Sequence, residues 1–507
     1  MEWLLYISYL LVLVSLAGYG FHRLTIIFLY LKHKDDKPEP KFEFEDLPVI
    51  TMQLPVFNEM HVVERLLEKV SEIDYPKDKL HIQVLDDSTD ETQEICTEQV
   101  ADLVARGYDA EYIHRTDRTG YKAGALENGI KSAKGDFLFI LDADFAPNPD
   151  VLLKTIHYFT DEKVGMIQTR WGHLNRNFNT LTRIQAMFLD GHLELEQTAR
   201  NRSGRFFTFN GTGGMWRKSC IADAGGWEHD TLTEDMDLSY RAQLKGWNFV
   251  FLKDVESPAE LPVDMDGFKS QQHRWTKGSI QCCKKCLVNI WKSDAPLKAK
   301  MEATAHLTSN FAYLALIVLC FLIYPNQTTH IPGVTGNRML ELFINLPIFF
   351  FGSVSVALFY LTAQKALNPK SWMKEIIYLP LLIALGIGMS VNNAKAVLEA
   401  IFNHQTGFVR TPKYGLDKGG EKAKEKSAGW KSSRYKAMKS LTPIIEFGFG
   451  VFFLMVVVSN FMDERYVTAI LLTPFPIGFF FTSFPSLKRM LSGFVKNNVE
   501  ESIDSGN

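Results

Sequence analysis

The stretch GDFLFILDAD, residues 135–144, decides the fold class of this chain. Its centre, Phe137–Leu141, is short and wholly apolar, which favours a buried β-strand. Asp142 and Asp144 follow directly. Because side chains alternate along an extended chain, these two carboxylates are expected to point the same way.

Strands and helices alternate on both sides of this stretch. The apolar runs Pro48–Leu54, His81–Leu85 and Ala110–His114 predict strands, and Met60–Ile73 and the segment from Lys122 to Ala133 predict helices. This alternation indicates an α/β domain with a mostly parallel sheet. In such sheets ligands bind beyond the carboxyl ends of the strands, which is where the acidic clusters of this sequence fall.

Composition indicates an enzyme-sized chain with an uneven distribution of apolar residues. The chain has 507 residues, too many for one compact core, and a net charge of -3, which does not favour a nucleic acid partner. Long apolar runs lie at the N-terminus and in the last 200 residues or so. The six cysteines do not form a secreted disulfide framework, and Cys282, Cys283 and Cys286 lack a second ligand pair at zinc spacing.

The N-terminal apolar run is expected to be a retained membrane anchor. It extends from Trp3 past Phe21 and ends in the basic residues Lys32, His33 and Lys34. A cleaved signal peptide would instead begin with basic residues. The basic flank places the following domain in the cytosol.

Four further apolar segments are long enough to predict membrane spans. The stretch 403–440, with ten Lys and Arg, suits the cytosolic side. A sixth apolar stretch, Ile376–Phe402, has basic flanks on both sides and polar residues in its second half, so we interpret it as re-entrant or interfacial. The four predicted spans are Leu307–Tyr324, Met339–Leu361, Thr442–Asn460 and Tyr466–Phe484.

Two acidic clusters follow predicted strands. Asp86 and Asp87 end one strand, where they could grip a bound nucleoside or cap the next helix. Asp142 and Asp144 end another, where two ionised carboxylates repel each other unless a cation lies between them. A hard divalent cation, Mg²⁺ or Mn²⁺, fits oxygen ligands and can bridge to a diphosphate. A simple turn is the alternative for this second cluster.

A third acidic element, Thr233-Glu234-Asp235, precedes a helical pattern. Transfer of a sugar needs a base that removes the proton from the acceptor hydroxyl, and Asp235 is our candidate, with Glu234 in reserve. A helix N-cap is the alternative.

The element Gln271-Gln272-His273-Arg274-Trp275 precedes the second membrane segment. The planar fork of Arg274 suits a diphosphate, and the flat face of Trp275 suits a sugar ring. Anchoring of Arg and Trp at a membrane surface is the alternative.

In order along the chain, the D-D, D-x-D, T-E-D and Q-x-x-R-W elements resemble those of the processive family 2 glycosyltransferases, such as cellulose, hyaluronan and chitin synthases. Three sequence segments are most similar to those of plant-type mannan, glucomannan and xyloglucan-backbone synthases and their bacterial relatives: QVLDDSTDET, LDADF and QQHRW. The resemblance covers about residues 45–300 and implies a nucleotide-sugar-binding domain of the GT-A type, inserted in an α-helical membrane bundle.

The resemblance also implies roles for the matching residues. Asp235 would be the catalytic base, Asp142 would face the nucleotide and Asp144 the metal. A segment near 408–413 resembles a gating loop in which Thr411 and Lys413 contact the diphosphate, although Val and Pro are shifted in this copy. The remaining binding residues would be Asp86 and Asp87 at the nucleoside, Lys122 at the base or diphosphate, Gly211 and Thr212 at the acceptor, and Gln271, Arg274 and Trp275 at the diphosphate and the acceptor end.

These expectations divide the chain into six parts. They are an N-terminal anchor (1–34), a cytosolic GT-A domain (35–300), two transmembrane helices (301–364), interfacial helices with the gating loop (365–440), two transmembrane helices (441–486) and a polar tail (487–507).

The sequence thus predicts a membrane-embedded, inverting hexosyltransferase that elongates a β-linked polysaccharide and secretes it as it grows. The expected donor is UDP-glucose or GDP-mannose, and the expected product is a β-1,4-mannan, a glucomannan or a β-glucan. The chain would reside among lipids of the plasma, inner or Golgi membrane, with its catalytic domain in the cytosol. Two alternatives stay open: a non-processive enzyme acting on a lipid, similar to ceramide glucosyltransferases, and a transporter or receptor that merely binds a nucleotide.

Overall fold

A seven-stranded sheet forms the base of the molecule. The computed structural model describes residues 2–328, 350–405, 411–416 and 441–504. The strand order is β3-β2-β1-β4-β6-β5-β7, and all neighbours are parallel except that β6 runs antiparallel to β4 and β5. The predicted α/β fold with a mostly parallel sheet is confirmed. The strands are β1 Ile50–Val56, β2 Leu80–Asp86, β3 Asp109–His114, β4 Phe137–Ile140, β5 Val164–His173, β6 Gly214–Arg217 and β7 Asn248–Ala259.

Helices cover both faces of this sheet, so its central strands are buried on both sides. Every residue of β2 and β4 is buried. In the register of the sheet Val56 pairs with Asp86 and Gln53 pairs with Ile140, so β1, β2 and β4 end at one edge. The helices of this unit are α2 Val63–Ser71, α3 Thr92–Ala105, α4 Tyr121–Ile130, α5 Leu153–Ile156, α6 Thr180–Asp190, α7 Gln197–Arg202, α8 Lys218–Asp223 and α9 Glu234–Leu244, with η3 Gly191–Glu196 between α6 and α7.

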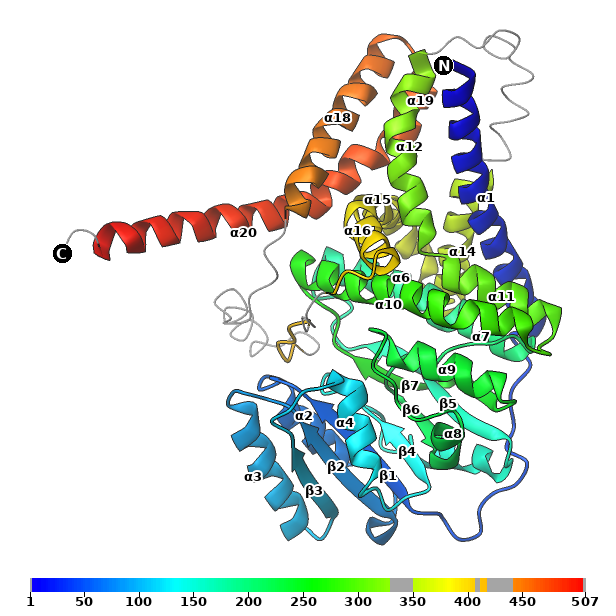
Figure 1. Ribbon diagram of the computed structural model, residues 1–507, viewed down its shortest axis with the longest axis vertical. Helices are drawn as coiled ribbons and strands as arrows, with labels where there is room; N and C mark the ends of the chain where they lie inside the picture. Colours follow the sequence, from blue (N-terminus) through cyan, green and yellow to red (C-terminus); the bar gives the residue numbers. More distant parts are fainter. Residues whose placement is uncertain (1, 329–349, 406–410, 417–440, 505–507) are drawn as a thin grey trace.

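The long helix α10, Met265–Lys292, lies between the sheet unit and the upper helices (Figure 1). Its first turn is fixed by Asp264, whose side chain accepts a hydrogen bond of 2.9 Å from the backbone N–H of Gly267. The helix packs against α9 below and against α11, Leu297–Thr308, and α16, Ser390–Ile401, above. It therefore connects the two halves of the molecule.

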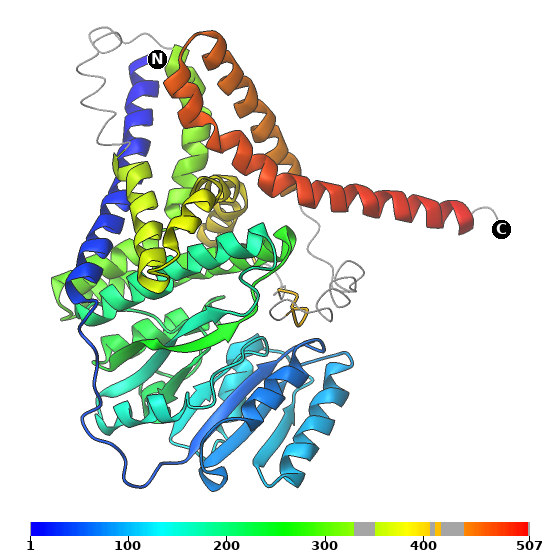
Figure 2. The same ribbon diagram turned by 180° about the vertical axis from the view of Figure 1, so that it is seen from behind.

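The upper half is a bundle of apolar helices (Figures 1 and 2). In the described part of the chain, four helical stretches are long and apolar enough to cross a membrane: Glu2–His33, Trp372–Ile401, Thr442–Met462 and Tyr466–Leu491. A fifth results if α11 and the following Phe311–Pro325, which are bent by 53°, count as one span. The bundle comprises α1 Glu2–His33, α12 Phe311–Thr328, η4 Phe350–Val354, α14 Ser355–Leu367, η5 Trp372–Tyr378, α15 Leu379–Gly388, α16, α18 Thr442–Met462, α19 Tyr466–Leu472 and α20 Pro474–Asp504.

Two of the predicted segments differ in detail from the structure, and a third lies partly outside the described residues. The span expected at Leu307–Tyr324 begins at Phe311, because residues 307–308 end α11. Residues 339–349 of the span expected at Met339–Leu361 lie outside the described residues. The region expected as a polar tail continues α20 as a helix to Asp504.

The stretch that we interpreted as interfacial is interrupted at Met389, between α15 and α16. In Figures 1 and 2 both helices lie low in the bundle, beside α10 and below the upright helices. By length and apolar content this stretch could also cross a membrane. Its interfacial position stays a prediction.

The ion pair between Lys269 of α10 and Glu446 of α18 is buried between the two halves, with Nζ 2.5 Å from Oε2. We expect Lys269→Met to destabilise the fold by about 3–5 kcal/mol, because it leaves a buried carboxylate without its cation. Thermal unfolding in detergent, followed by tryptophan fluorescence, measures this loss. The matched double variant Lys269→Met/Glu446→Leu should recover most of it; equal losses in both would contradict this role of the pair.

Candidate functional site

Side chains from distant segments meet at the carboxyl edge of the sheet. Asp142, just after β4, donates its backbone N–H to Oγ1 of Thr212 over 2.8 Å. Its carboxylate pairs with Nζ of Lys122 from α4, which also donates to the carbonyl of Gly211 over 3.0 Å. The loop before β6 is thereby attached to the end of β4.

Gly211 allows a carboxylate to approach this loop. Its φ of +85° is in the left-handed region, and a Cβ added there would lie 3.0 Å from Oδ2 of Asp235 and 3.7 Å from Nζ of Lys122. The structure therefore brings Asp235 and Lys122 to the same small space. Position 211 favours glycine for two separate reasons: its left-handed backbone conformation, and the short distance from a Cβ to the Asp235 carboxylate.

Glu234 and Asp235 begin helix α9. Burial, with a further contribution from the charge of Glu234, raises the pKa of Asp235 to about 7. Burial also raises the pKa of Glu234. Thr233, at the N-cap position, makes no capping hydrogen bond with its side chain, whereas Asp235 accepts the backbone N–H of Met236 over 2.8 Å. A carboxyl group that exchanges its proton near neutral pH is suited to proton transfer.

Arg274 faces this acidic site from helix α10. Burial lowers the pKa of its guanidinium, and the opposing attraction comes from four carboxylates at once, those of Glu234, Asp142, Asp235 and Asp144. A single cation thus stands opposite both acidic elements. Gln271 and Trp275, which the sequence predicted beside Arg274, are both partly buried, and Trp275 packs against a small apolar cluster.

The second aspartate of the D-x-D element is held by the segment 411–416. Nζ of Lys413 lies 2.6 Å from Oδ2 of Asp144 and also donates to the carbonyl of Glu260. Thr411, two residues before Lys413, is buried. Its hydroxyl has no hydrogen-bond partner among the described residues. The first residues of the expected gating loop, 408–410, lie outside the described residues.

Asp142 and Asp144 fit the expected divalent cation by their chemistry. Repulsion from Asp144 adds to burial in raising the pKa of Asp142, against the attraction of Lys122, so the two carboxylates act on each other electrostatically. Both offer hard oxygen ligands. In this structure Lys122 and Lys413 supply the positive charge that such an ion would bring.

Asp86 and Asp87 lie at the same edge but are engaged with protein groups. Asp86 is fully buried and accepts hydrogen bonds from the hydroxyl of Tyr112 over 2.7 Å and from the backbone N–H of Ser88 over 2.9 Å. Asp87 holds Arg115 through two hydrogen bonds of 2.8 and 2.6 Å. Neither residue caps α3. The side chain of Asp90 instead accepts the backbone N–H of Thr92, the first residue of α3.

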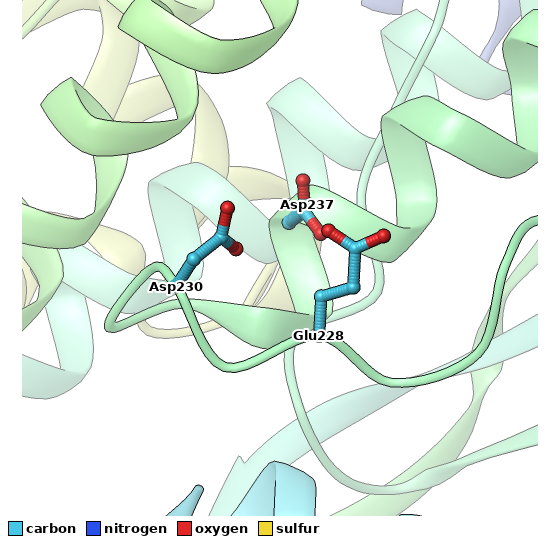
Figure 3. A group of neighbouring side chains, drawn as sticks. All are labelled: Glu228, Asp230 and Asp237. Carbon is cyan, nitrogen blue, oxygen red and sulfur yellow. The ribbon is translucent and has the colours of Figure 1, made fainter.

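Another acidic group, Glu228, Asp230 and Asp237, has the spacing of a metal site, with ligand oxygens within 4.8 Å of one another (Figure 3). Nζ of Lys285 from α10 lies 2.5, 2.6 and 3.1 Å from these three carboxylates. The ammonium group of Lys285 therefore already occupies the position that a metal would take. We interpret this group as an ionic link that fixes the start of α9 against α10, where Gly278 leaves no room for a side chain beside Thr233.

Sequence reasoning missed two residues of the site, Glu260 and Arg65. Both carboxylate oxygens of Glu260 accept backbone N–H groups of the segment 411–416, from Tyr414 over 2.9 Å and from Leu416 over 3.1 Å. Arg65 lies 3.6 Å from Glu260 and donates to the carbonyl of Asp144 over 3.2 Å. Glu260 directly follows a strand, as Asp87 and Asp142 follow theirs, but β7 was not among the predicted strands.

Glu260→Gln should loosen the segment that carries Lys413. The amide keeps one acceptor oxygen and loses one charge-assisted hydrogen bond, worth about 1.5–3 kcal/mol, so trypsin should cleave after Lys413 about tenfold or more faster. Mass spectrometry of the timed digest locates and measures that cut. Glu256→Gln on β7, which weakens an ion pair with Arg170 but removes no hydrogen bond to the described segment 411–416, is the control, and an unchanged rate in Glu260→Gln would contradict the anchoring role.

Comparison with known proteins matches the sheet unit to a family. Residues 48–278 match the family described as "Glycosyltransferase like family 2". Probable glucomannan 4-beta-mannosyltransferase 4 of Oryza sativa subsp. japonica is 39% identical over 285 residues, which are 55% of this chain and 51% of the rice protein. Glucomannan 4-beta-mannosyltransferase 1 of the same plant is 37% identical over 304 residues, 59% of this chain and 57% of that protein. The chain thus spans a little over half the length of the curated relatives it matches.

A solved structure shares the fold. Mannosyltransferase PcManGT from Pyrobaculum calidifontis, in complex with GDP-Man and Mn²⁺, superposes with a TM-score of 0.54 at 19% identity, over 78% of this chain and 100% of that one. At this identity the likeness concerns the fold alone. The sheet, the order of the acidic elements and the matched family agree with the resemblance drawn from the sequence: residues 48–278 of this chain form a glycosyltransferase family 2 domain.

Proposed function

We propose that this protein is a membrane-embedded, inverting hexosyltransferase that transfers mannose from GDP-mannose to a growing β-linked polysaccharide. The observation that carries the proposal is the meeting of Asp235, Lys122, Asp142 and Arg274 at one edge of the sheet, from four separate segments. A base with a raised pKa beside cations that can accept a diphosphate is the arrangement that this transfer needs.

Asp235 takes the proton of the acceptor hydroxyl as its oxygen attacks C1 of the α-linked donor sugar. The bond from C1 to the diphosphate breaks on the opposite face, so the product is β-linked. Arg274 and Lys413 then face the negative charge that develops on the leaving nucleoside diphosphate. Asp235 is held by the backbone N–H of Met236 over 2.8 Å, and Lys413 by Asp144 over 2.6 Å.

Asp142 and Asp144 would hold the divalent cation, Mg²⁺ or Mn²⁺, which when bound supplies further stabilisation of the departing diphosphate. Lys122 and Lys413 must then release these carboxylates at least in part. Freed from Asp144, Lys413 stands within reach of an incoming phosphate.

Mannose is our preferred sugar because the relatives that match at 37–39% identity are glucomannan mannosyltransferases. The shared fold with a mannosyltransferase crystallised with GDP-Man and Mn²⁺ is compatible with this choice. A 1,4 linkage and secretion of the product across the membrane follow from the same resemblance and belong to the proposal. The apolar helices described above would embed the chain in lipid, with the sheet unit in the cytosol.

A donor panel tests the proposal as a whole. Membranes that contain the protein are incubated with radiolabelled GDP-mannose or UDP-glucose and with Mn²⁺ or Mg²⁺, and the product is digested with linkage-specific hydrolases. GDP-mannose should give a large product that β-1,4-mannanase degrades. Incorporation from UDP-glucose alone would contradict the donor assignment, and a small lipid-soluble product would favour the lipid-acceptor alternative.

Replacement of the base should abolish transfer without loss of the donor site. We expect Asp235→Asn to lower kcat by about 10²–10⁴-fold, the usual contribution of a general base. Binding of GDP-mannose, measured by calorimetry, should stay within a few-fold of the wild type. Glu234→Gln is the matched control, and if it lost activity while Asp235→Asn kept it, Glu234 would be the base.

The raised pKa of Asp235 predicts the pH dependence. Below pH 7 Asp235 is protonated and cannot accept a proton, so kcat should rise about tenfold per pH unit up to about 7 and level off above it. Glu234→Gln removes a neighbouring negative charge, which should lower the pKa of Asp235 and move the rise to lower pH. A profile of kcat against pH at saturating donor measures both. A flat wild-type profile between pH 5 and 7 would contradict the assignment.

A further inference from the structure

A cavity of about 450 Å³ lies on the side of the helical bundle, away from the acidic site. Its walls come from α12, α16 and α18, and they are mostly aliphatic and aromatic. Several wall residues are also exposed at the surface, with Phe321 at 63%, Ile445 at 52% and Leu398 at 40%. A cavity of about 300–1,000 Å³ is typical of sites for small ligands, and this one opens on a surface that the proposed function places in lipid.

One end of the cavity is polar and carries positive charge. Lys395 and His404 line it together with Glu399. Nζ of Lys277 donates to the carbonyl of His404 over 2.6 Å and to Glu399 over 3.3 Å, and Nζ of Lys284 donates to the last carbonyls of α16. Among the described residues, Lys395 therefore lines the cavity itself, while Lys277 and Lys284 contact its wall from α10 without lining it. Lys395 is the most accessible of the cavity-lining charges, with its side chain 45% exposed.

We propose that this cavity binds one anionic glycerophospholipid, with an acyl chain along the apolar walls and the phosphate beside Lys395 and His404. Basic pockets between membrane helices on the cytosolic side suit anionic headgroups, and the excess of lysines selects against a neutral one. The polar content of the walls is too low for a carbohydrate chain, which would need hydrogen-bond partners along its length. The inference rests on the proposed membrane location and is independent of sugar transfer.

The site is connected to the helix that carries Arg274. Glu399, on the cavity wall, lies 3.0 Å from Nε2 of His273 and 3.3 Å from Nζ of Lys277, both on α10. Lys395 stands one turn before Glu399 on α16, 3.9 Å from its carboxylate. A phosphate drawn to Lys395 therefore acts on the same ion pairs that hold α16 against α10.

Quenching by brominated lipid tests the inference without reference to activity. The full-length protein with Phe402→Trp, a replacement at the exposed rim of the cavity, is reconstituted in phosphatidylcholine that contains brominated phosphatidylglycerol or brominated phosphatidylcholine. The difference in tryptophan fluorescence from the parent chain reports contact. We expect brominated phosphatidylglycerol to reach half-maximal quenching at an about fivefold lower mole fraction than brominated phosphatidylcholine. This is the effect of one lysine on an anionic lipid.

Two controls decide the outcome. Met455→Trp, on the outer face of α18, should be quenched equally by both lipids, and adding Lys395→Gln to Phe402→Trp should remove the preference. No preference at Phe402→Trp, a preference that survives Lys395→Gln, or the same preference at Met455→Trp would each overturn the proposal. Loss of quenching by both lipids at Phe402→Trp would also overturn it, because the cavity would then hold something other than lipid.

Discussion

Negative charge gathered at the carboxyl edge of the sheet is the constraint on which the rest of the site depends. Asp142, Asp144, Glu234 and Asp235 lie close enough together that all four attract the same guanidinium, that of Arg274. Like charges at such separation need cations between them. The cations come from α4, from α10 and from the segment 411–416, so charge balance determines which distant parts of the chain must meet.

Helix α10 connects this charged site to the bundle of apolar helices. Along its 28 residues it is held by Asp264 at its first turn, by Glu446 near its start and by the acidic group around Lys285 toward its end. Arg274 lies between these attachments. A helix of this length spans about 42 Å as one rigid element, so the site and the bundle keep a fixed relation.

The sequence alone was sufficient for four of the seven strands, β1–β4, but not for β5, β6 and β7. It also named Asp142, Lys122 and Asp235, which the structure brings together. The strand Phe137–Leu141 was predicted from its apolar pattern, and Asp142 and Asp144 from the rule that ligands bind beyond strand ends. Both rules need only a few consecutive residues. Glu260 and the partners of Asp87 were not predictable in this way, because they depend on pairings across 154 and 28 residues that only the fold creates. The polar residues in the second half of Ile376–Phe402 led us to expect an interfacial or re-entrant stretch, which stays a prediction. The helical course of α20 to Asp504 was hidden by its polar composition.

The lysines that neutralise the D-x-D element have a consequence for how the protein is made. Because Lys122 and Lys413 balance Asp142 and Asp144 from within the chain, folding of the domain does not need an external cation to neutralise these carboxylates. Under the proposed function, folding of the protein and supply of its donor are then independent events. A shortage of sugar nucleotide would leave the protein folded rather than exposed to degradation.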